Sequence, residues 1–356
     1  MKATILGSNG YGGMLLLRIL AKHPEIDLVV ASSRSQAGQA VRDADPGVPD
    51  VALRNGRIHP TVLAPEDALS HDSDVVFSAL PHGASAAICE PILGTIPLID
   101  LSADFRFERE DHFTAAYGTP WPAAEHQNRA VYGLPEWYRY QLRDAQIIAN
   151  PGCYPTATLL PLLPLVEGGL ITGTVVVNAL SGITGAGRTA KVNTLFGERT
   201  ENANAYAPGT QHRHQAEISE RLACTVGANT STAGAPDAPE ANIYPLLFTP
   251  HLVPIKQGMA VTTVVSVTDT ERAVAAIRTR YTNEPFVELT GTRPPETREV
   301  RATNRIRIGW REEAGVLILM SVIDNLWKGA SGQAVQNMNV RFGFDETAGL
   351  TGFGDL

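Results

Sequence analysis

The sequence predicts an α/β protein, with a Rossmann-like, doubly wound first domain followed by an α+β domain around a mixed sheet. Short apolar strands alternate with helical segments up to about residue 150, which is typical of a parallel sheet. A Gly-rich turn directly follows the first of these strands. Beyond residue 150, longer β-rich segments have fewer helices between them, which favours a mixed or antiparallel sheet.

The first domain is predicted to comprise residues 1–150. Its expected strands are 2–7, 28–32, 73–80, 97–100 and 146–150, and its expected helices are 14–22 and 84–93. Apolar residues recur at helical spacing over 332–342. We therefore expect a C-terminal helix, within about 330–356, that returns to complete this domain.

The second domain is predicted to comprise residues 151–329. Its expected helices are 158–166 and 272–280, and its expected strands are 174–179, 260–267 and 315–322. The stretch 226–240 is rich in Ala, Gly, Pro and Thr, which predicts an exposed loop.

Composition excludes several classes of partner. The chain has 356 residues and a net charge of −8, which argues against nucleic acid because phosphate backbones require clustered cations. No apolar run approaches the roughly 20 residues of a membrane helix, and we expect no signal peptide. The three cysteines are few and odd in number, which suits a reducing cytoplasm. Cys89 and Cys224 are interpreted as small buried residues.

The glycine turn predicts a dinucleotide site. Gly7, Gly10 and Gly13 lie between the first strand and the first helix, where glycine lets the backbone approach a pyrophosphate at the helix N-terminus. The candidate cofactor-binding residues of this turn are Gly7, Ser8, Asn9, Gly10, Tyr11, Gly12 and Gly13. The spacing differs from the usual G-x-G-x-x-G, so a turn that binds no ligand is the alternative.

The end of the second strand favours NADP over NAD. An NAD site usually has an acidic residue here for the ribose 2′-hydroxyl, whereas this chain has Ser33 and Arg34. A hydroxyl and a guanidinium suit a 2′-phosphate. The alternative is that Arg34 is a solvated loop residue.

Cys153 is the candidate nucleophile. It follows a predicted strand and opens a helix in the sequence NPGCYPTAT at 150–158. A thiol at a helix N-terminus is stabilised as thiolate by free N–H groups and the helix dipole, and the same donors can hold an oxyanion. We expect the end of the first domain to place this thiol near the nicotinamide, whereas a packed interdomain Cys is the alternative.

His212 is the candidate acid or base, since imidazole can exchange protons near neutral pH. Glu217 lies five residues later and could orient His212 or a substrate amine. The spacing of His212 and His214 lacks further metal ligands nearby, so we expect no metal. The alternative for both histidines is a polar surface loop.

Two further clusters could bind an anion. The run SGITGAGR at 181–188 offers a backbone nest with Arg188 as counter-charge. The run LSADFR at 101–106 ends a strand and offers Ser102 and Arg106. Either could be only a tight loop. We assign Ser181 and Gly182 to the cofactor, and Ser102, Arg106, Asn150 and Arg188 to a phosphate-bearing substrate.

These motifs together resemble the N-acetyl-gamma-glutamyl-phosphate reductase family of arginine biosynthesis, over nearly the whole chain. The stretches that carry the resemblance are LPHG at 80–83, LSADFR at 101–106, NPGCYPTA at 150–157, SGITGAGR at 181–188, HRHQAE at 212–217, FTPHLVP at 248–254 and DNLWKG at 324–329. The resemblance implies NADPH-dependent reduction of a small acyl phosphate, with Cys153 as thioester nucleophile and His212 as acid/base residue. It also implies that Asn325 and residues 328–333 lie beside the nicotinamide, and that the second domain forms a homo-oligomer, a dimer or tetramer.

Three alternatives remain open at this point. One is a related reductase of a carrier-bound aminoadipyl or glutamyl phosphate, although 181–188 resembles the arginine branch more. A second relative, aspartate-semialdehyde dehydrogenase, has a different motif around its cysteine. The third is a nucleotide-binding redox sensor without turnover, which leaves Cys153 and His212 without a purpose.

Overall fold

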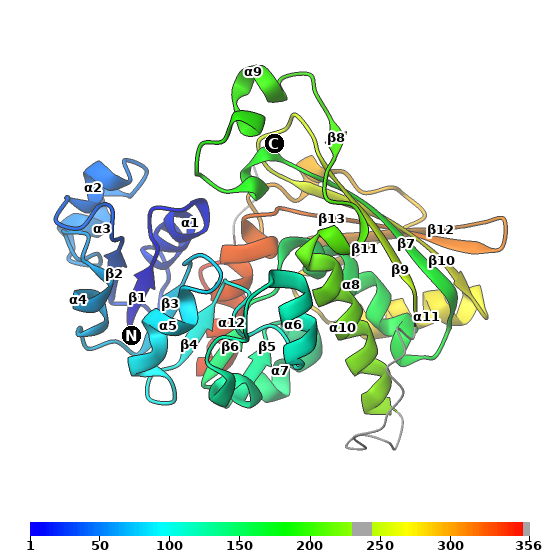
Figure 1. The fold of residues 1–356 in the computed structure, drawn as a ribbon, viewed down its shortest axis with the longest axis horizontal. Coiled ribbons are helices and arrows are strands. Elements are labelled where there is room, and N and C mark those ends of the chain that lie inside the picture. Colours follow the sequence, from blue (N-terminus) through cyan, green and yellow to red (C-terminus); the bar gives the residue numbers. More distant parts are fainter. Residues whose placement is uncertain (230–243, 352–356) are drawn as a thin grey trace. The chain divides into compact units, whose positions relative to one another are not determined.

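The computed structural model describes residues 1–229 and 244–351, although not the side chains of 226–229. It divides into two compact units (Figure 1). The first contains Met1–Glu108, Pro120–Gly152 and the described residues from Leu326 to Thr351. The second contains Arg109–Thr119 and Cys153–Asn325. The segment Arg109–Thr119, expected in the first domain, therefore clusters with the second unit.

The first unit contains a fully parallel sheet, as expected. Its strands are β1 (Lys2–Leu6), β2 (Leu28–Ser32), β3 (Val75–Ser78), β4 (Leu98–Asp100), β5 (Ala130–Tyr132) and β6 (Ile147–Ala149). They lie in the order β2-β1-β3-β4-β6-β5, which is a doubly wound arrangement because the chain moves outward from β1 in both directions. The sequence did not predict β5, which has three residues and no hydrophobic periodicity of its own.

Helices connect and cover these strands. They are α1 (Tyr11–Leu20), α2 (Val41–Ala44), α3 (Asp50–Arg54), α4 (Pro65–Leu69), α5 (Ser85–Cys89), α7 (Pro135–Leu142) and α12 (Gly332–Phe342). The bounds of α12 match the prediction. Helix α1 begins three residues earlier than expected, because the glycine turn itself forms the first helical turn after Gly10.

The second unit contains a mixed sheet. Its strands are β7 (Ile171–Ser181), β8 (Asn204–Ala205), β9 (Leu246–Leu252), β10 (Met259–Val267), β11 (Val287–Gly291), β12 (Ile306–Glu313) and β13 (Val316–Ile323). Their order is β11-β12-β13-β10-β7-β9-β8, with β11–β12 and β7–β9 parallel and the other pairs antiparallel. The described helices of this unit are α6 (Glu110–Tyr117), α8 (Cys153–Glu167), α9 (Phe196–Arg199), α10 (Arg213–Asn229) and α11 (Thr270–Tyr281).

One loop prediction is wrong in part. Residues 226–229 of the expected loop 226–240 continue helix α10, and 230–240 lie outside the described residues. The helical turns from Arg213 onward carry Ile218, Leu222 and their neighbours into the core, and this tertiary packing outweighs the weak helix propensity of the last turn.

Helix α8 is buried on all sides from Tyr154 to Val166, and its two internal prolines have specific compensation. Pro161 and Pro164 lack the N–H groups that would bond the carbonyls of Ala157 and Leu160. The Ser321 hydroxyl donates to the Ala157 carbonyl at 2.7 Å, and the Tyr281 hydroxyl donates to that of Leu160. Side chains of β13 and α11 thus satisfy the two backbone acceptors that the prolines expose.

No helix within 1–229 or 244–351 is both long and apolar enough to cross a membrane.

We expect Tyr281→Phe to destabilise the protein by about 1–3 kcal/mol, because it leaves the buried Leu160 carbonyl without a donor. Tyr140→Phe is the matched control, since the Tyr140 side chain is 81% exposed. Adding Pro164→Ala to Tyr281→Phe should recover stability by returning an N–H to that carbonyl. The measurement is the midpoint of urea-induced unfolding, and equal midpoints for the two Tyr→Phe variants would contradict this account of α8.

Candidate active site and nucleotide site

The turn between β1 and α1 requires glycine at both ends. Gly7 has φ +78°, and a Cβ there would lie 2.6 Å from the Ala79 carbonyl oxygen. A Cβ on Gly13 would lie 2.2 Å from the Gly7 carbonyl oxygen. At Gly10 the nearest atom to such a Cβ is 3.8 Å away. At Gly7 and Gly13 the backbone is therefore packed directly against other backbone. Only the middle of the turn, at Gly10, has open space beside it.

The N-terminus of α1 carries no side-chain cap. Gly10 is its N-cap residue, so the first N–H groups have no side-chain acceptor, which is the arrangement that binds a pyrophosphate. Ser8 is instead committed to the sheet, because its N–H and hydroxyl both donate to the Ser32 carbonyl at 2.8 and 3.0 Å. Asn9 donates to the Ser35 hydroxyl at 3.2 Å and ties the turn to the end of β2. Tyr11 and Gly12 lie partly exposed in the first turn.

A segment distant in sequence contacts this turn. The π-helical turn Trp327–Ser331 precedes α12, and the Ser331 hydroxyl donates to the Gly12 carbonyl at 2.8 Å. Only the family resemblance predicts that 328–333 lie near the cofactor, and nothing in the sequence distinguishes Ser331. Single π-helical turns are frequent at functional sites, and this one becomes visible only in the backbone structure.

Lys328 does not present its charge to this turn. Its side chain is fully buried, and its ammonium group donates to Glu136 at 2.5 Å and to Gln336 at 2.7 Å. Burial raises the pKa of Glu136, but Lys328 outweighs that effect, so the carboxyl pKa lies below its usual value. Lys328 therefore anchors the π-turn within the first unit, and Gln333 does the same by donating to the Gly133 carbonyl at 2.8 Å.

Arg34 is exposed at the end of β2, but a carboxylate lies beside it. Glu66, at the start of α4, accepts from Arg34 at 2.6 Å. The expectation that this end of β2 lacks a carboxylate is therefore wrong, because Glu66 approaches from the following strand–helix connection. Both side chains are about two-thirds exposed, and such a surface pair contributes only about 0–1 kcal/mol. Ser33 is 3% exposed, and its N–H donates to the Leu63 carbonyl.

Ser102 is buried, and its hydroxyl donates to the Asp100 carboxylate at 2.6 Å. It also accepts the Asp104 N–H at 3.1 Å. Burial, followed by repulsion from Asp104, raises the pKa of Asp100 to about 6. The expectation that Ser102 binds substrate is not supported, because this hydroxyl stabilises a buried carboxylate instead.

Arg106 holds the end of β6 in place through hydrogen bonds to backbone carbonyls. Its guanidinium donates to the carbonyls of Asn150 and Leu101, both at 2.8 Å, and its side chain is 5% exposed. The Asn150 side chain donates to the Ala330 carbonyl at 3.2 Å and accepts from Asn337 at 3.0 Å. Arg106 and Asn150, both expected to bind substrate, thus fix the backbone three residues before Cys153.

Cys153 is the first residue of α8 and is partly exposed. Tyr154, the next residue, and Tyr206, which precedes α10, place their hydroxyl oxygens 3.1 Å apart. Burial raises the pKa of Tyr206 to about 12; its hydrogen bond with Tyr154 acts in the opposite sense, and the charge of a Cys153 thiolate adds to the rise. The pKa of Tyr154 is raised for related reasons, burial first. Both tyrosines therefore remain neutral beside the thiol. Neither tyrosine is predicted from the sequence to lie at the site.

His212 lies in the same aromatic cluster. Its ring centroid is 5.5 Å from those of Tyr154 and Tyr206, 5.3 Å from Phe248 and 5.0 Å from His214. Burial, followed by the neighbouring Arg213 charge, lowers the pKa of His212 to about 4. The imidazole is therefore neutral at physiological pH. The alternative of a polar surface loop is wrong for His212, which directly precedes helix α10.

Glu217 is 1% exposed and lies one turn into α10. The group that orients His212 is the backbone N–H of His214, which donates to Nδ1 at 3.1 Å. The sequence suggested Glu217 as the group that orients His212 only because it lies five residues later. The contact with the His214 N–H follows from the start of helix α10 at Arg213, which the sequence does not reveal.

The loop after β7 is held by Asn325. Its amide donates to the Thr184 hydroxyl at 3.0 Å, and its carbonyl accepts the Gly258 N–H at 2.8 Å. Ser181 is buried, and Gly182 has backbone against it, because a Cβ there would lie 2.8 Å from the Gln257 nitrogen. Asn325 is thus a structural clamp of this loop.

The other residues singled out from the sequence differ in their exposure to solvent. Arg188 is exposed beyond the 181–185 turn. Cys89 is buried, and burial raises the pKa of its thiol to about 12, whereas Cys224 is only partly buried. The described part of the chain contains no group of three or more His, Cys, Asp or Glu side chains placed to hold a metal ion.

Comparison with known proteins defines the class. A semialdehyde dehydrogenase NAD-binding domain matches residues 2–145, and a semialdehyde dehydrogenase dimerisation domain matches 153–325. Aspartate semialdehyde dehydrogenase II from Vibrio cholerae has the same fold, with a TM-score of 0.68 at 18% identity over 95% of this chain and 97% of that one. The chain is therefore an oxidoreductase of the semialdehyde dehydrogenase type, with a domain for a nicotinamide cofactor.

Full-length relatives narrow this class. Two proteins named N-acetyl-gamma-glutamyl-phosphate reductase are 43% identical (Azotobacter vinelandii, 98% of each chain) and 42% identical (Pseudomonas fluorescens, 100% of this chain and 99% of the relative). A third, from Marinobacter nauticus, is 40% identical over 98% of each chain. The chain belongs to the N-acetyl-gamma-glutamyl-phosphate reductase family.

The glycine turn gives a matched pair of variants. Gly10→Ala places its Cβ in open space, so it should leave the thermal unfolding midpoint nearly unchanged but weaken dinucleotide binding by about tenfold or more. Gly13→Ala drives its Cβ into the Gly7 carbonyl and should destabilise the fold by at least about 1–3 kcal/mol. Thermal unfolding and fluorescence titration with cofactor measure the two effects. Unimpaired cofactor binding by Gly10→Ala would show that the open side of the turn is not the pyrophosphate site.

Proposed function

We propose that this chain reduces N-acetyl-gamma-glutamyl phosphate with NADPH, to N-acetylglutamate 5-semialdehyde and phosphate, through a thioester on Cys153. The observation that carries the proposal is the partly exposed Cys153 at the first position of buried helix α8, beside Tyr154 and Tyr206, with His212 packed against both tyrosine rings. The relatives that are 40–43% identical carry the name of this reductase and support the choice of substrate.

The Cys153 thiolate attacks the acyl carbon, and the bond from that carbon to the phosphate oxygen breaks. The first-turn N–H groups of α8 stabilise both the thiolate and the oxyanion that forms. A bound nicotinamide cofactor would supply the hydride that reduces the resulting thioester. The neutral rings of Tyr154 and Tyr206 beside Cys153 keep the thioester away from bulk water and so limit its hydrolysis.

The substrate phosphate is assigned to Arg188 rather than to Arg106. Arg188 is exposed beside the glycine-rich turn after β7, whereas the Arg106 guanidinium is held by two backbone carbonyls. The two domains have separate proposed roles. Residues 1–150, together with the C-terminal helix, bind the cofactor. Residues 151–329 bind the substrate and form the oligomer.

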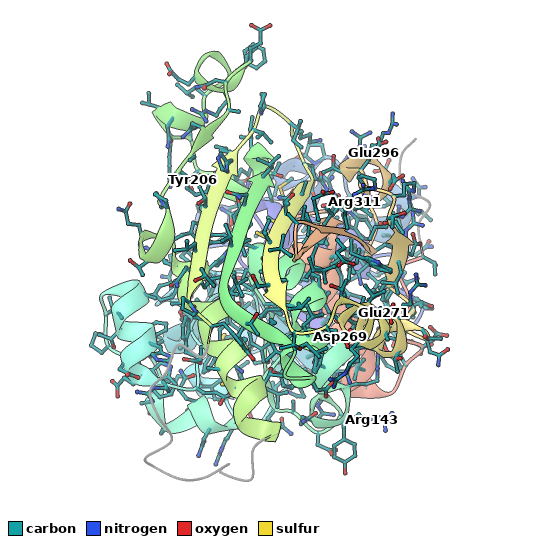
Figure 2. The ribbon with its side chains drawn as sticks, turned by 90° about the vertical axis from the view of Figure 1, so that its right-hand side faces the viewer. Arg143, Tyr206, Asp269, Glu271, Glu296 and Arg311 are labelled. Carbon is teal, nitrogen blue, oxygen red and sulfur yellow. The ribbon has the colours of Figure 1, made fainter. Side chains whose placement is uncertain are left out.

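The oligomer proposal is supported by exposed apolar side chains of the second unit. Leu180 and Leu247 are 42% and 57% exposed on neighbouring strands of its sheet, which Figure 2 shows towards the viewer. Val192, Leu195 and Phe196, on the segment beyond β7, are 74%, 51% and 84% exposed. Exposed apolar side chains of this size are typical of a protein interface, here that of a homo-oligomer, a dimer or tetramer. All three cysteines are free thiols, which supports a cytoplasmic location.

The NADP preference has a direct test. Arg34→Asp should raise the Michaelis constant for NADPH and narrow the preference over NADH, because it removes the counter-charge of the 2′-phosphate. Glu66→Gln should strengthen the preference, because it frees Arg34 from its ion pair. The ratio of kcat/KM for NADPH and NADH is the measurement. Equal use of both cofactors by the wild-type protein would contradict the assignment.

The covalent mechanism is tested by mass spectrometry. Protein mixed with acyl phosphate, without NADPH, should gain an acyl group on Cys153. Cys153→Ser should fold and bind NADPH but lose nearly all turnover, because an alcohol supplies no low-pKa anion at that position. Cys224→Ser is the control, since Cys224 is also a partly exposed thiol of the second unit. Substantial turnover by Cys153→Ser would rule out the thioester.

The same preparation separates the remaining alternatives. In the reverse direction, N-acetylglutamate 5-semialdehyde with phosphate and NADP⁺ should react faster than aspartate semialdehyde. A redox sensor would turn over neither.

A further inference from the structure

A cavity lies between helix α11 and strand β12 of the second unit. Its volume is about 430 Å³, and all the residues that line it belong to that unit. Helix α11 contributes Glu271 from its first turn (Figure 2) and Arg278 from further along the helix. Strand β12 contributes Trp310 and Glu312. The volume is within the range of about 300–1,000 Å³ that is typical of small-molecule sites.

Trp310 fixes the position of a guanidinium group in this cavity. The Arg278 Cζ atom lies over the Trp310 ring, 4.9 Å from the ring centroid, and Trp310 itself is only 5% exposed. Because Arg278 contacts the ring face, its N–H groups remain able to donate to an acceptor. Within the part of the chain that the structure describes, neither the Arg278 side chain nor the Trp310 indole N–H has a hydrogen-bond acceptor.

Two carboxylates line the same cavity. Glu271 and Glu312 are exposed, and across 1–229 and 244–351 neither carboxylate accepts a hydrogen bond or forms an ion pair. Glu313, the next residue, differs because it pairs with Arg311 at 3.6 Å. Successive side chains of a strand point to opposite faces, so that pair lies on the other face of β12. The cavity lining therefore presents two negative groups and one positive group.

We propose that this cavity binds a free α-amino acid with a cationic side chain. The ligand carboxylate accepts from Arg278, and its two cationic groups donate to Glu271 and Glu312. Such a ligand carries one carboxylate and two cations, which is the complement of the lining. A diamine would leave Arg278 without an acceptor, and a dicarboxylate would be repelled by both glutamates. The inference goes beyond the proposed function and does not depend on it.

The cavity is distinct from the site of Cys153. Helix α11 runs antiparallel to α8, because the Thr268 N–H donates to the Leu170 carbonyl beyond the end of α8, whereas Tyr281 reaches back to Leu160. The first turn of α11 therefore lies near the C-terminus of α8. Cys153 is the first residue of α8, about 20 Å away at 1.5 Å per residue. A ligand in the cavity does not occupy the position of an acyl group on that thiol.

Calorimetric titration of the full chain with L-lysine and with L-arginine is the first test. We expect saturable binding of one molecule per chain, with a Kd on the order of 1 mM or lower. Cadaverine lacks the carboxylate and L-norleucine lacks the side-chain cation, so each should bind at least about tenfold more weakly than L-lysine. Absence of saturable binding, or equal binding of either control compound, overturns the proposal.

Four variants test the assignment of the charged groups. Arg278→Ala and Glu312→Gln should each weaken L-lysine binding at least about tenfold. Arg272→Ala and Glu313→Gln are the matched controls, since these exposed residues lie on the same elements but do not line the cavity. Both controls should bind within about twofold of the wild type. Glu312→Gln leaves the contact of Arg278 with Trp310 intact, so unchanged binding by this variant, or an equal loss in the controls, overturns the proposal.

The location is tested by ¹⁹F NMR of protein that carries 5-fluorotryptophan. The chain has four tryptophans, and Trp310→Phe identifies the signal of Trp310. That signal should shift with L-lysine concentration and saturate together with the calorimetric heat, because the ligand binds beside the ring. If heat is released while the Trp310 signal stays unchanged, the amino acid binds elsewhere and the proposal is wrong.

Discussion

The hydrogen bonds around Asn150 are the constraint that fixes the end of β6 in the first unit. At the end of β6, the Asn150 carbonyl accepts from Arg106, its side chain bonds Asn337 and Ala330, and its N–H donates to the Asp100 carbonyl. These partners come from two segments distant in sequence, 100–106 and 330–337, and each satisfies a polar group that would otherwise be buried alone. Along the chain, only Pro151 and Gly152 separate this position from Cys153, the first residue of α8.

Helix N-termini supply most of the electrostatics of both sites. The start of α1 lacks a side-chain cap and is open to an anion. The start of α8 carries Cys153 as its first residue. The start of α10 is capped by the His212 ring, which fixes its tautomer. One backbone feature thus favours an anion at the first two positions and a neutral imidazole at the third, because each site places a different group at the positive end of the helix.

Polar residues near a motif proved harder to assign than the motifs themselves. Gly7 and Gly13 have the backbone contacts that a strand–helix turn demands, and these follow from local sequence alone. Ser102 and Arg106 have the chemistry of anion ligands, but their partners are Asp100 and backbone carbonyls. Lys328 likewise meets Glu136, a residue 192 positions away. The identity of a Ser or Arg residue does not indicate whether its hydroxyl or guanidinium binds a ligand or a buried carbonyl.

By itself, the sequence determined the fold class, most of the parallel strands, the glycine turn, and Cys153 as the opening residue of a helix. These features depend on hydrophobic period, glycine conformation and strand–helix order, which are local properties. Only the tertiary structure decided that Glu66 meets Arg34, that Ser331 meets Gly12, and that Tyr154, Tyr206 and Phe248 surround His212. It also decided the compensation of Pro161 and Pro164 by Ser321 and Tyr281. The reason is that these contacts join segments far apart in the chain, and their geometry is fixed by packing rather than by the identity of sequence neighbours.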